Sequence, residues 1–145
     1  MLALIQRVNY ARLTIDAQLH AEIGVGLLAL IGVEKDDNSA NVDKLLEKLL
    51  AYRVFADEAG KMNLGLKDIA GDLMLVSQFT LAATTDKGLR PGFSSAMPPA
   101  EAEQLYNEMV EKAGQRHAVV RSGVFAADMQ IALENNGPVT FMLKV

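Results

Sequence analysis

The residues best suited to chemistry follow an apolar run in the middle of the chain. The run is Leu73-Met74-Leu75-Val76, and the stretch after it is Ser77-Gln78-Phe79-Thr80-Leu81. A continuous apolar run of this length is typical of a buried strand. Hydroxyls, an amide and exposed backbone N–H groups at a rigid strand end could hold a carbonyl or stabilise an oxyanion. The alternative is that these hydroxyls only cap local backbone groups.

A second unusual stretch lies near the C-terminus, Asn135-Asn136-Gly137-Pro138-Val139-Thr140. Pro138 has no N–H group, so Gly137-Pro138 is expected at a turn or at a sheet edge. Bonds that precede proline carry most of the cis peptides in proteins. A cis Gly-Pro would present two carbonyls in the same direction and could reject a side chain on one side of a ligand's α-carbon. Most Gly-Pro turns only turn the chain, and that alternative stays open.

Few residues in the chain could support metal or thiol chemistry. There is no cysteine, which excludes disulfides, thiol catalysis and thiolate metal sites. Both histidines, His20 and His117, are expected at the surface. A Ser-His-Asp triad with Ser77 is arithmetically possible, but no spacing favours it. We therefore expect neither a bound metal nor a cofactor.

Length and charge limit the class of protein. A chain of 145 residues suits one domain. The net charge of -4 argues against a general nucleic-acid coat binder and against a DNA partner, but it allows a protein that grips the end of an RNA. No apolar window is long enough for a membrane span, and the N-terminus lacks the features of a signal peptide. A cytoplasmic protein without a membrane partner is expected.

Alternating and helical patterns predict strands first, then two helices among further strands. The first helix carries apolar residues at helical spacing from Val42 to Leu50, and the second begins at Pro98-Pro99 and ends at Gly114. The main predicted strands are 2–9, 11–16, 27–33, 73–76, 117–120, 127–133 and 139–145, the last two joined by a turn at Gly137-Pro138. This order predicts a single α+β domain over residues 1–145 with its sheets covered by two helices.

The segment 82–98 is longer than an ordinary connection. Loops of this length in a domain are usually functional or disordered. Lys87 and Arg90 lie in it beside hydroxyl residues and could take a phosphate. A solvated surface loop is the alternative.

Taken together, Ser77-Gln78-Phe79-Thr80-Leu81 and Asn136-Gly137-Pro138-Val139-Thr140 resemble the two signature motifs of the D-aminoacyl-tRNA deacylases. Further stretches match in the same order along the chain: Ile5-Gln6-Arg7-Val8, Gly60-Lys61-Met62-Asn63, Arg90-Pro91 and Phe125-Ala126-Ala127-Asp128-Met129. The resemblance covers essentially the whole chain. It implies the α+β fold of that family, two mixed or antiparallel sheets that form a barrel-like core covered by two helices.

The resemblance also implies an activity. Members of the family are hydrolases that cleave the ester between a D-amino acid and the terminal adenosine of tRNA, and they also remove mischarged glycine. They contribute chiral proofreading to translation and reject L-aminoacyl-tRNA with a Gly-cisPro motif. They use no cofactor, bind the aminoacylated acceptor end of tRNA, and work as homodimers with cross-subunit active sites.

Roles for the motif residues follow from the same resemblance. Gly137 and Pro138 would screen chirality, because their carbonyls would exclude an L side chain. Ser77, Gln78 and the backbone N–H of Phe79 would hold the aminoacyl group and stabilise the oxyanion.

The resemblance also offers candidates for the nucleophile and for the RNA contacts. Thr80 matches a threonine once assigned as the nucleophile, whereas a later view gives the chemistry to the 2′-hydroxyl of the tRNA. Thr80 has no histidine in its own segment to activate it, which favours the later view. Phe125 and Met129 are candidates for the adenine pocket, with a core role as the alternative. Lys87 and Arg90 are the candidates for contact with the tRNA.

Two other functions stay open on the sequence. A non-catalytic module that binds aminoacyl-tRNA ends or amino acids would need a pocket but no oxyanion site, so Gln78 and Phe79 would be dispensable to it. A general serine or threonine esterase should lose all turnover when Ser77 and Thr80 are both replaced by alanine.

Overall fold

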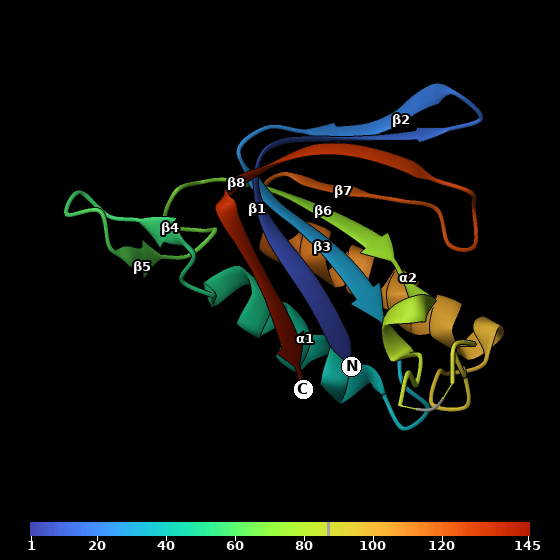
Figure 1. Cartoon of the computed structure of the whole chain (residues 1–145). Helices are drawn as coiled ribbons and strands as arrows, with labels where there is room; N and C mark the ends of the chain where they lie inside the picture. The colour runs from blue at the N-terminus through green and yellow to red at the C-terminus, as the bar shows by residue number, and fades with distance from the viewer. Residues whose placement is uncertain (87) are drawn as a thin grey trace.

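Two long strands, β1 (Leu2–Ile15) and β8 (Gln130–Lys144), pair antiparallel along most of their length. The structure is a computed structural model that describes residues 1–86 and 88–145. The first half of β1 also pairs with β3 (Gly26–Gly32), whereas its second half pairs with β2 (Gln18–Ile23). Because β1 changes partner half-way along, the six-stranded sheet curls into a nearly closed barrel (Figure 1).

Two parallel strands extend the sheet beyond β3. They are β6 (Asp72–Ser77), which pairs with β3, and β7 (Val120–Ser122), which pairs with β6. Each parallel connection contains a helix, α1 (Ser39–Ala51) before β6 and α2 (Pro99–Arg116) before β7. Both helices cover the same face of the sheet (Figure 1). The predicted α+β class with a barrel-like sheet and two helices is confirmed.

Three short elements complete the chain. The 3-10 helix η1 (Phe79–Ala82) follows β6 directly. Strands β4 (Phe55–Ala56) and β5 (Met62–Leu64) form a small hairpin that projects from the body (Figure 1). Over the part of the chain that the structure describes, no helix is long and apolar enough to cross a membrane.

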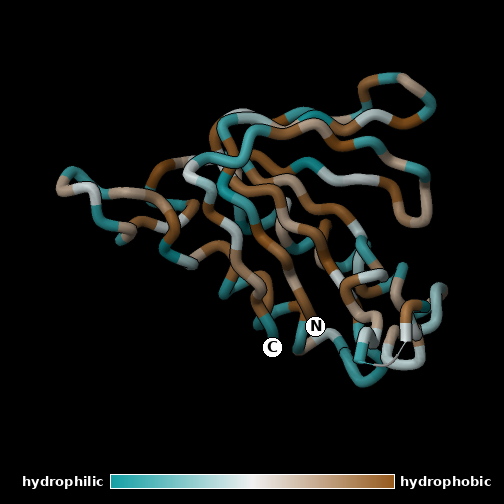
Figure 2. Tube along the Cα trace, viewed as in Figure 1, coloured by the Kyte–Doolittle hydropathy of each residue, from teal (hydrophilic) through white to brown (hydrophobic). Residues whose placement is uncertain are grey.

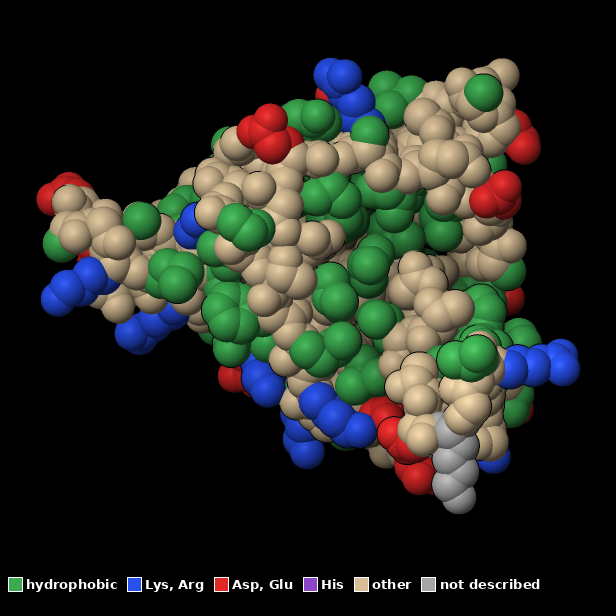
Figure 3. Space-filling view, in the orientation of Figure 1, with side chains coloured by type: hydrophobic (Ala, Val, Ile, Leu, Met, Phe, Trp, Pro, Cys, Tyr) green, Lys and Arg blue, Asp and Glu red, His purple; other side chains and the backbone are tan. Residues whose placement is uncertain are grey.

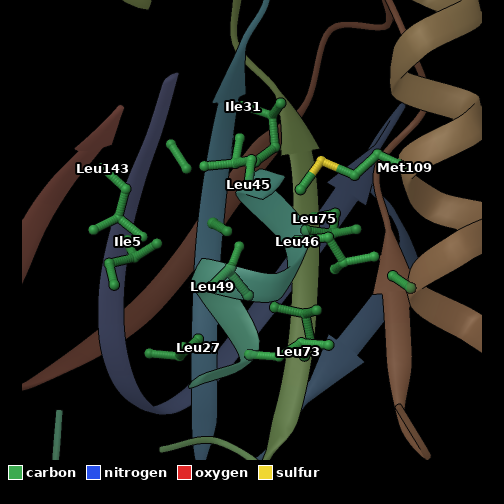
Figure 4. Packing of buried hydrophobic residues seen from close by; sticks show 14 of the residues in the cluster. Ile5, Leu27, Ile31, Leu45, Leu46, Leu49, Leu73, Leu75, Met109 and Leu143 are labelled. Atoms are coloured by element: carbon green, nitrogen blue, oxygen red, sulfur yellow. The ribbon is translucent and has the colours of Figure 1, made fainter. Parts of the chain in front are cut away.

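Side chains on the two faces of the sheet enter two hydrophobic cores. On the helix side, Ile5, Leu27, Ile31, Leu75 and their neighbours pack against α1 and α2 (Figure 4). The other face contributes a second core inside the barrel: Val8, Ala11, Leu13, Ala21, Ile23, Leu28, Met74 and Val76. Burial on both faces explains why the central strands are continuously apolar in sequence (Figure 2). At about 1.5–3 kcal/mol for each large buried side chain, these contacts hold β6 firmly in place.

The structure corrects the predicted ends of the second helix and the strand after it. Gly114 does not stop α2, which continues to Arg116, because Gly114 keeps a helical backbone and Arg116 pairs with Asp43 on α1. The strand predicted at 117–120 is instead Val120–Ser122, where the backbone meets β6. His117 is not a free surface residue, since its Nε2 atom lies 2.6 Å from the carbonyl oxygen of Gly71.

Two predictions of where strands begin and end were wrong. Residues 2–15 form one continuous strand where two were predicted, because β8 pairs with both halves, and 18–23 forms a strand of its own. Gly137-Pro138 is not a turn between two strands but a bulge inside β8. Residues 136–139 lie opposite Arg7 alone, between the pairs Gln6↔Thr140 and Val8↔Asn135. The bulge accommodates a proline that cannot donate to the ladder.

Candidate active site

A cavity of about 690 Å³ opens at the C-terminal end of β6. Its walls come from the end of β6, from η1, from the segment leading into α2, and from the segment between β7 and β8. The lining residues are Val76, Ser77, Gln78, Phe79, Phe93, Ala96, Met97, Pro98, Pro99, Ala102, Phe125, Ala126, Ala127, Asp128, Met129 and Ile131. The cavity therefore brings together Ser77, Gln78 and Phe79 with the two candidates for an adenine pocket.

The parallel pairing of β3 and β6 fixes the strand end that carries Ser77 and Gln78. Ser77 lies opposite Ile31, and the N–H of Gln78 donates to the Ile31 carbonyl at 2.7 Å. The chain then turns at once into η1. Gly32 permits this turn, because a Cβ atom at that position would lie 2.9 Å from the Cβ of Leu81.

The first turn of η1 leaves backbone donors available. Leu81 donates the first bond of the turn, to the carbonyl of Gln78 at 3.2 Å. The N–H groups of Phe79 and Thr80 precede it and have no acceptor within the helix. A 3-10 start at a strand end can therefore offer N–H donors to a carbonyl oxygen or an oxyanion.

Thr80 is placed beside the cavity and not in its wall. Its Oγ1 atom accepts a hydrogen bond from the Nε2 group of Gln78. The amide oxygen and the second amide proton of Gln78 remain for a ligand. This contact makes Thr80 a partner of Gln78.

Tyr106 ties the opposite wall to β6. Its buried hydroxyl lies 2.9 Å from the carbonyl oxygen of Leu75 and 3.1 Å from that of Gly123, and burial raises the pKa of Tyr106. Gly123 also donates to Leu75 at 2.9 Å. A Cβ atom at Gly123 would lie 2.6 Å from the sulfur of Met129, so glycine allows Met129 to reach the cavity.

Phe125 and Met129 line the cavity and also contact the cores. Phe125 packs against the helix-side core and lies 6.1 Å from the Tyr106 ring, centroid to centroid. Met129 packs against the barrel core. The sequence left open whether these residues line a ligand pocket or pack in the core, and the structure shows that they do both.

Gly137 and Pro138 lie far from this cavity within one chain. They are exposed, and the peptide bond between them is cis. Along the sheet, Arg7 beside the bulge lies level with Leu73, so Ser77 is about 13 Å further along the strands. The three strand spacings from β8 to β6 add about 14 Å across the sheet.

A polar network holds the bulge. Arg7 donates from Nε to the carbonyl of Asn136 at 3.0 Å and from Nη1 to the carbonyl of Val54 at 2.6 Å. The side chain of Asn135 accepts from the N–H of Val139 at 2.9 Å and donates to Thr140 at 2.7 Å. Two guanidinium bonds to two carbonyls thus fix the segment before Gly137 against the start of the β4–β5 hairpin.

Of the two charged candidates for RNA contact, the structure describes Arg90. Arg90 is exposed and does not line the cavity. Its loop is closed by reciprocal backbone bonds between Thr84 and Gly92 at 2.8 and 3.0 Å. Lys87 lies outside the described residues.

The histidines do not assemble a triad with Ser77. His117 is bound at Gly71, before the opposite end of β6, and His20 is exposed on β2. Within 1–86 and 88–145, no group of three or more His, Cys, Asp or Glu side chains is arranged to hold a metal ion. The chemistry of the cavity rests on hydroxyl, amide and backbone groups, with Asp128 as the acidic side chain in its wall.

Sequence reasoning missed several residues that shape the site. Phe93, Met97 and Asp128 line the cavity, Tyr106 ties its wall to β6, and Arg7 braces the bulge. An aromatic residue in a long polar loop was the available signal for Phe93. Arg7 and Asp128 lay inside matching stretches, but sequence spacing alone assigned them no role.

Comparisons with known proteins agree along the whole chain. The sequence model of the D-Tyr-tRNA(Tyr) deacylase family matches residues 4–144. A relative from Cellvibrio japonicus (strain Ueda107), named D-aminoacyl-tRNA deacylase, is 56% identical over 145 residues, which cover 100% of this chain and 99% of that protein.

Two solved structures share the fold. One, titled c-Myc DNA Unwinding Element Binding Protein, has a TM-score of 0.96 at 35% identity and covers 100% of this chain and 99% of its own. The other, titled as a probable eukaryotic D-amino acid tRNA deacylase, has a TM-score of 0.83 at 16% identity and covers 99% of this chain and 98% of its own. The barrel and its two helices are therefore a shared architecture.

Proposed function

The chain belongs to the D-Tyr-tRNA(Tyr) deacylase family, and from this membership we propose that it hydrolyses the ester between a D-amino acid and the terminal adenosine of tRNA. Its substrate is the aminoacylated acceptor end of tRNA, and it works in the cytoplasm as a single domain without a DNA partner. The observation that carries the proposal is the cavity at the end of β6, where Ser77 and Gln78 lie beside N–H groups of η1 that have no acceptor within that helix.

Hydrolysis in this cavity needs the ester carbonyl to be held while water attacks it. Ser77, the Gln78 amide and the N–H of Phe79 bind the aminoacyl group and stabilise the negative oxygen of the tetrahedral intermediate. Collapse of the intermediate breaks the bond to the ribose oxygen and releases the free amino acid and the tRNA hydroxyl. The 2′-hydroxyl of the ribose assists the proton transfer, because Thr80 is engaged by Gln78 and no histidine adjoins it.

A Ser77→Ala, Thr80→Ala double variant separates this route from a serine or threonine esterase. Measurable deacylation by the folded double variant is expected, since neither hydroxyl is the nucleophile. A complete loss with normal thermal unfolding would contradict it.

A homodimer completes the site across the subunits. Gly137 and Pro138 cannot reach the cavity of their own chain, which lies about 13 Å along and about 14 Å across the sheet. They are exposed on a braced bulge, as a group that enters a partner's cavity must be. Apolar side chains also gather over β1 and β3 on the face away from the helices (Figure 3). Met142, 53% exposed there and paired with Leu4, supports association through this face.

The partner's Gly137 and Pro138 screen the chirality of the amino acid. Their carbonyls lie against the α-carbon and leave no room for an L side chain, while a D side chain points away. Glycine carries no side chain on either face, so mischarged glycine passes the screen and is also removed.

Hydrolysis of D-tyrosyl-tRNA and L-tyrosyl-tRNA by the purified protein, measured side by side, tests the proposal. Rapid loss of the D ester with the L ester spared is the expected result. Equal loss of both would contradict the chiral screen. No loss of either from a folded protein would favour a non-catalytic module that binds aminoacyl-tRNA ends.

A further inference from the structure

Two phenylalanine rings meet at the wall of the cavity without being buried. Phe79 is 60% exposed and Phe93 is 41% exposed, and their ring centroids lie 5.0 Å apart at an interplanar angle of 49°. Both line the cavity together with Ser77 and Gln78. Among the described residues, neither ring packs against the two hydrophobic cores, whereas Phe125 and Met129 do.

Backbone bonds hold this aromatic pair in place. Phe79 opens η1, whose register is set by the bond from Gln78 to Ile31. Phe93 follows the closed Thr84–Gly92 loop, and its carbonyl accepts from the N–H of Ala96 at 3.1 Å. The hydroxyl of Ser95 donates to the Ala82 carbonyl at 2.6 Å and ties this segment to η1. The rings are therefore presented by two anchored segments.

We propose that Phe79 and Phe93 form a stacking platform for the base that precedes the terminal adenosine of the acceptor end. The inference rests on the proposed function, which places the ester of the terminal adenosine at Ser77 and Gln78. The preceding nucleotide, a cytidine in tRNA, then lies one step along the strand, at the edge of the same cavity. Single-stranded RNA is bound mainly by stacking of its bases on exposed aromatic side chains.

The surroundings of the rings fit an RNA strand. Arg90 is exposed in the loop that leads to Phe93 and can meet a phosphate of the same strand. Stacking uses the face of a base and not its hydrogen-bonding edge, so it suits an end sequence that all tRNAs share.

Two esters that differ only in length test the platform: D-tyrosyl-adenosine and the D-tyrosyl ester of the trinucleotide cytidylyl-cytidylyl-adenosine. The unsubstituted protein is expected to show a KM at least about fivefold lower for the trinucleotide ester. Phe93→Leu keeps an apolar side chain but removes the ring, and should reduce this ratio of KM values to roughly twofold or less. Phe93→Trp keeps an aromatic face and should preserve the ratio. Thermal unfolding of both variants shows whether they fold. If Phe93→Leu does not fold, Phe93→Trp is the test, and loss of the KM ratio in that folded variant would overturn the inference.

Three results would overturn the inference. The first is equal KM values for the two esters with the unsubstituted protein. The second is a Phe93→Leu variant in which the KM rises by the same factor for both esters. The third is dissociation of the Phe93→Leu dimer in gel filtration, which would make a second copy of the chain the occupant of these rings.

Failure of the proposed function gives a different result. Neither ester is then hydrolysed by the unsubstituted protein, and binding of the unacylated trinucleotide measures the platform directly. Weaker binding by Phe93→Leu than by Phe93→Trp would support stacking, and equal binding would overturn it.

Discussion

The cavity at the end of β6 and the bulge on β8 are built in opposite ways. The cavity stands on a buried strand between two cores, and its walls are tied together by buried contacts such as that of the Tyr106 hydroxyl. The bulge is exposed, and hydrogen bonds from Arg7 and Asn135 hold its backbone. Changes to the buried contacts behind the cavity should therefore affect stability, whereas changes at the bulge should mainly affect activity.

This difference also separates the two tasks of the proposed reaction. Stabilising an oxyanion requires donors that do not move, which a buried strand end provides. A group that enters another subunit has to project from the surface, where a local polar brace must replace the core.

Replacement of Gln78 by alanine should lower kcat/KM for D-tyrosyl-tRNA by about 10²-fold, because one preorganised donor of the cavity is lost. Gln18→Ala, an exposed change on β2, is the matched control and should leave the rate unchanged. A loss below about threefold in Gln78→Ala would contradict a role for Gln78 in the reaction.

Gly137→Ala should lower the rate by about tenfold while the midpoint of thermal unfolding stays within a few degrees. Gly137 has a φ of +130°, and an added Cβ atom would lie 2.8 Å from the Val139 side chain and 2.9 Å from Nη2 of Arg7. The bulge must shift, and of these two neighbours only the half-buried Val139 packs against a core. Gly114→Ala is the control, since its Cβ would meet nothing within 4 Å. Global unfolding of Gly137→Ala would contradict the contrast between the two regions.

Arg7→Lys should lower the rate by roughly threefold to tenfold, because a lysine cannot reach both carbonyls that the guanidinium joins. Arg12→Lys, at a surface pair with Glu22, should change the rate by less than about twofold. Comparison of kcat/KM for the two variants measures how much the hydrogen bonds of Arg7 contribute to the rate. Equal rates for both would mean that the bulge keeps its shape without Arg7.

Tyr106→Phe should reduce the free energy of unfolding by about 1–2 kcal/mol, because it removes a buried donor to the Leu75 and Gly123 carbonyls. The corresponding fall in the thermal midpoint is about 2–6 °C, with little change in rate at 25 °C. Tyr10→Phe, at a residue 38% exposed, should leave the midpoint unchanged. An unaltered midpoint in Tyr106→Phe would show that the wall of the cavity is not coupled to the core.

Local patterns predicted much of the fold. The apolar spacing from Val42 to Leu50 predicted α1, and Pro98-Pro99 predicted the start of α2 within one residue. These features depend on neighbours in the chain, such as the amphipathic face and the absence of N–H on proline. The end of α2 was wrong, because Gly114 is compatible with a helix whose last turn is held by Asp43 of another helix.

The predicted limits of the strands were wrong where pairing with a distant strand decides them. The single strand Leu2–Ile15 exists because β8 pairs with both halves, and the bulge at Gly137 exists because Gln6 and Val8 pair on either side of it. Neither partner is near in sequence. The roles of Phe93 and Tyr106 escaped notice for the same reason, since their neighbours come from other elements.

Composition and residue order carry the class of fold, the two motifs and the absence of cysteine directly, so these could be predicted without coordinates. That Ser77, Gln78 and Phe79 share a cavity with Phe93, and that Gly137 lies too far away to join them within one chain, follows from the packing of the strands and helices. Distances across a sheet depend on which strands pair and in which register. That information resides in packing between residues remote in the chain, and no local pattern contains it.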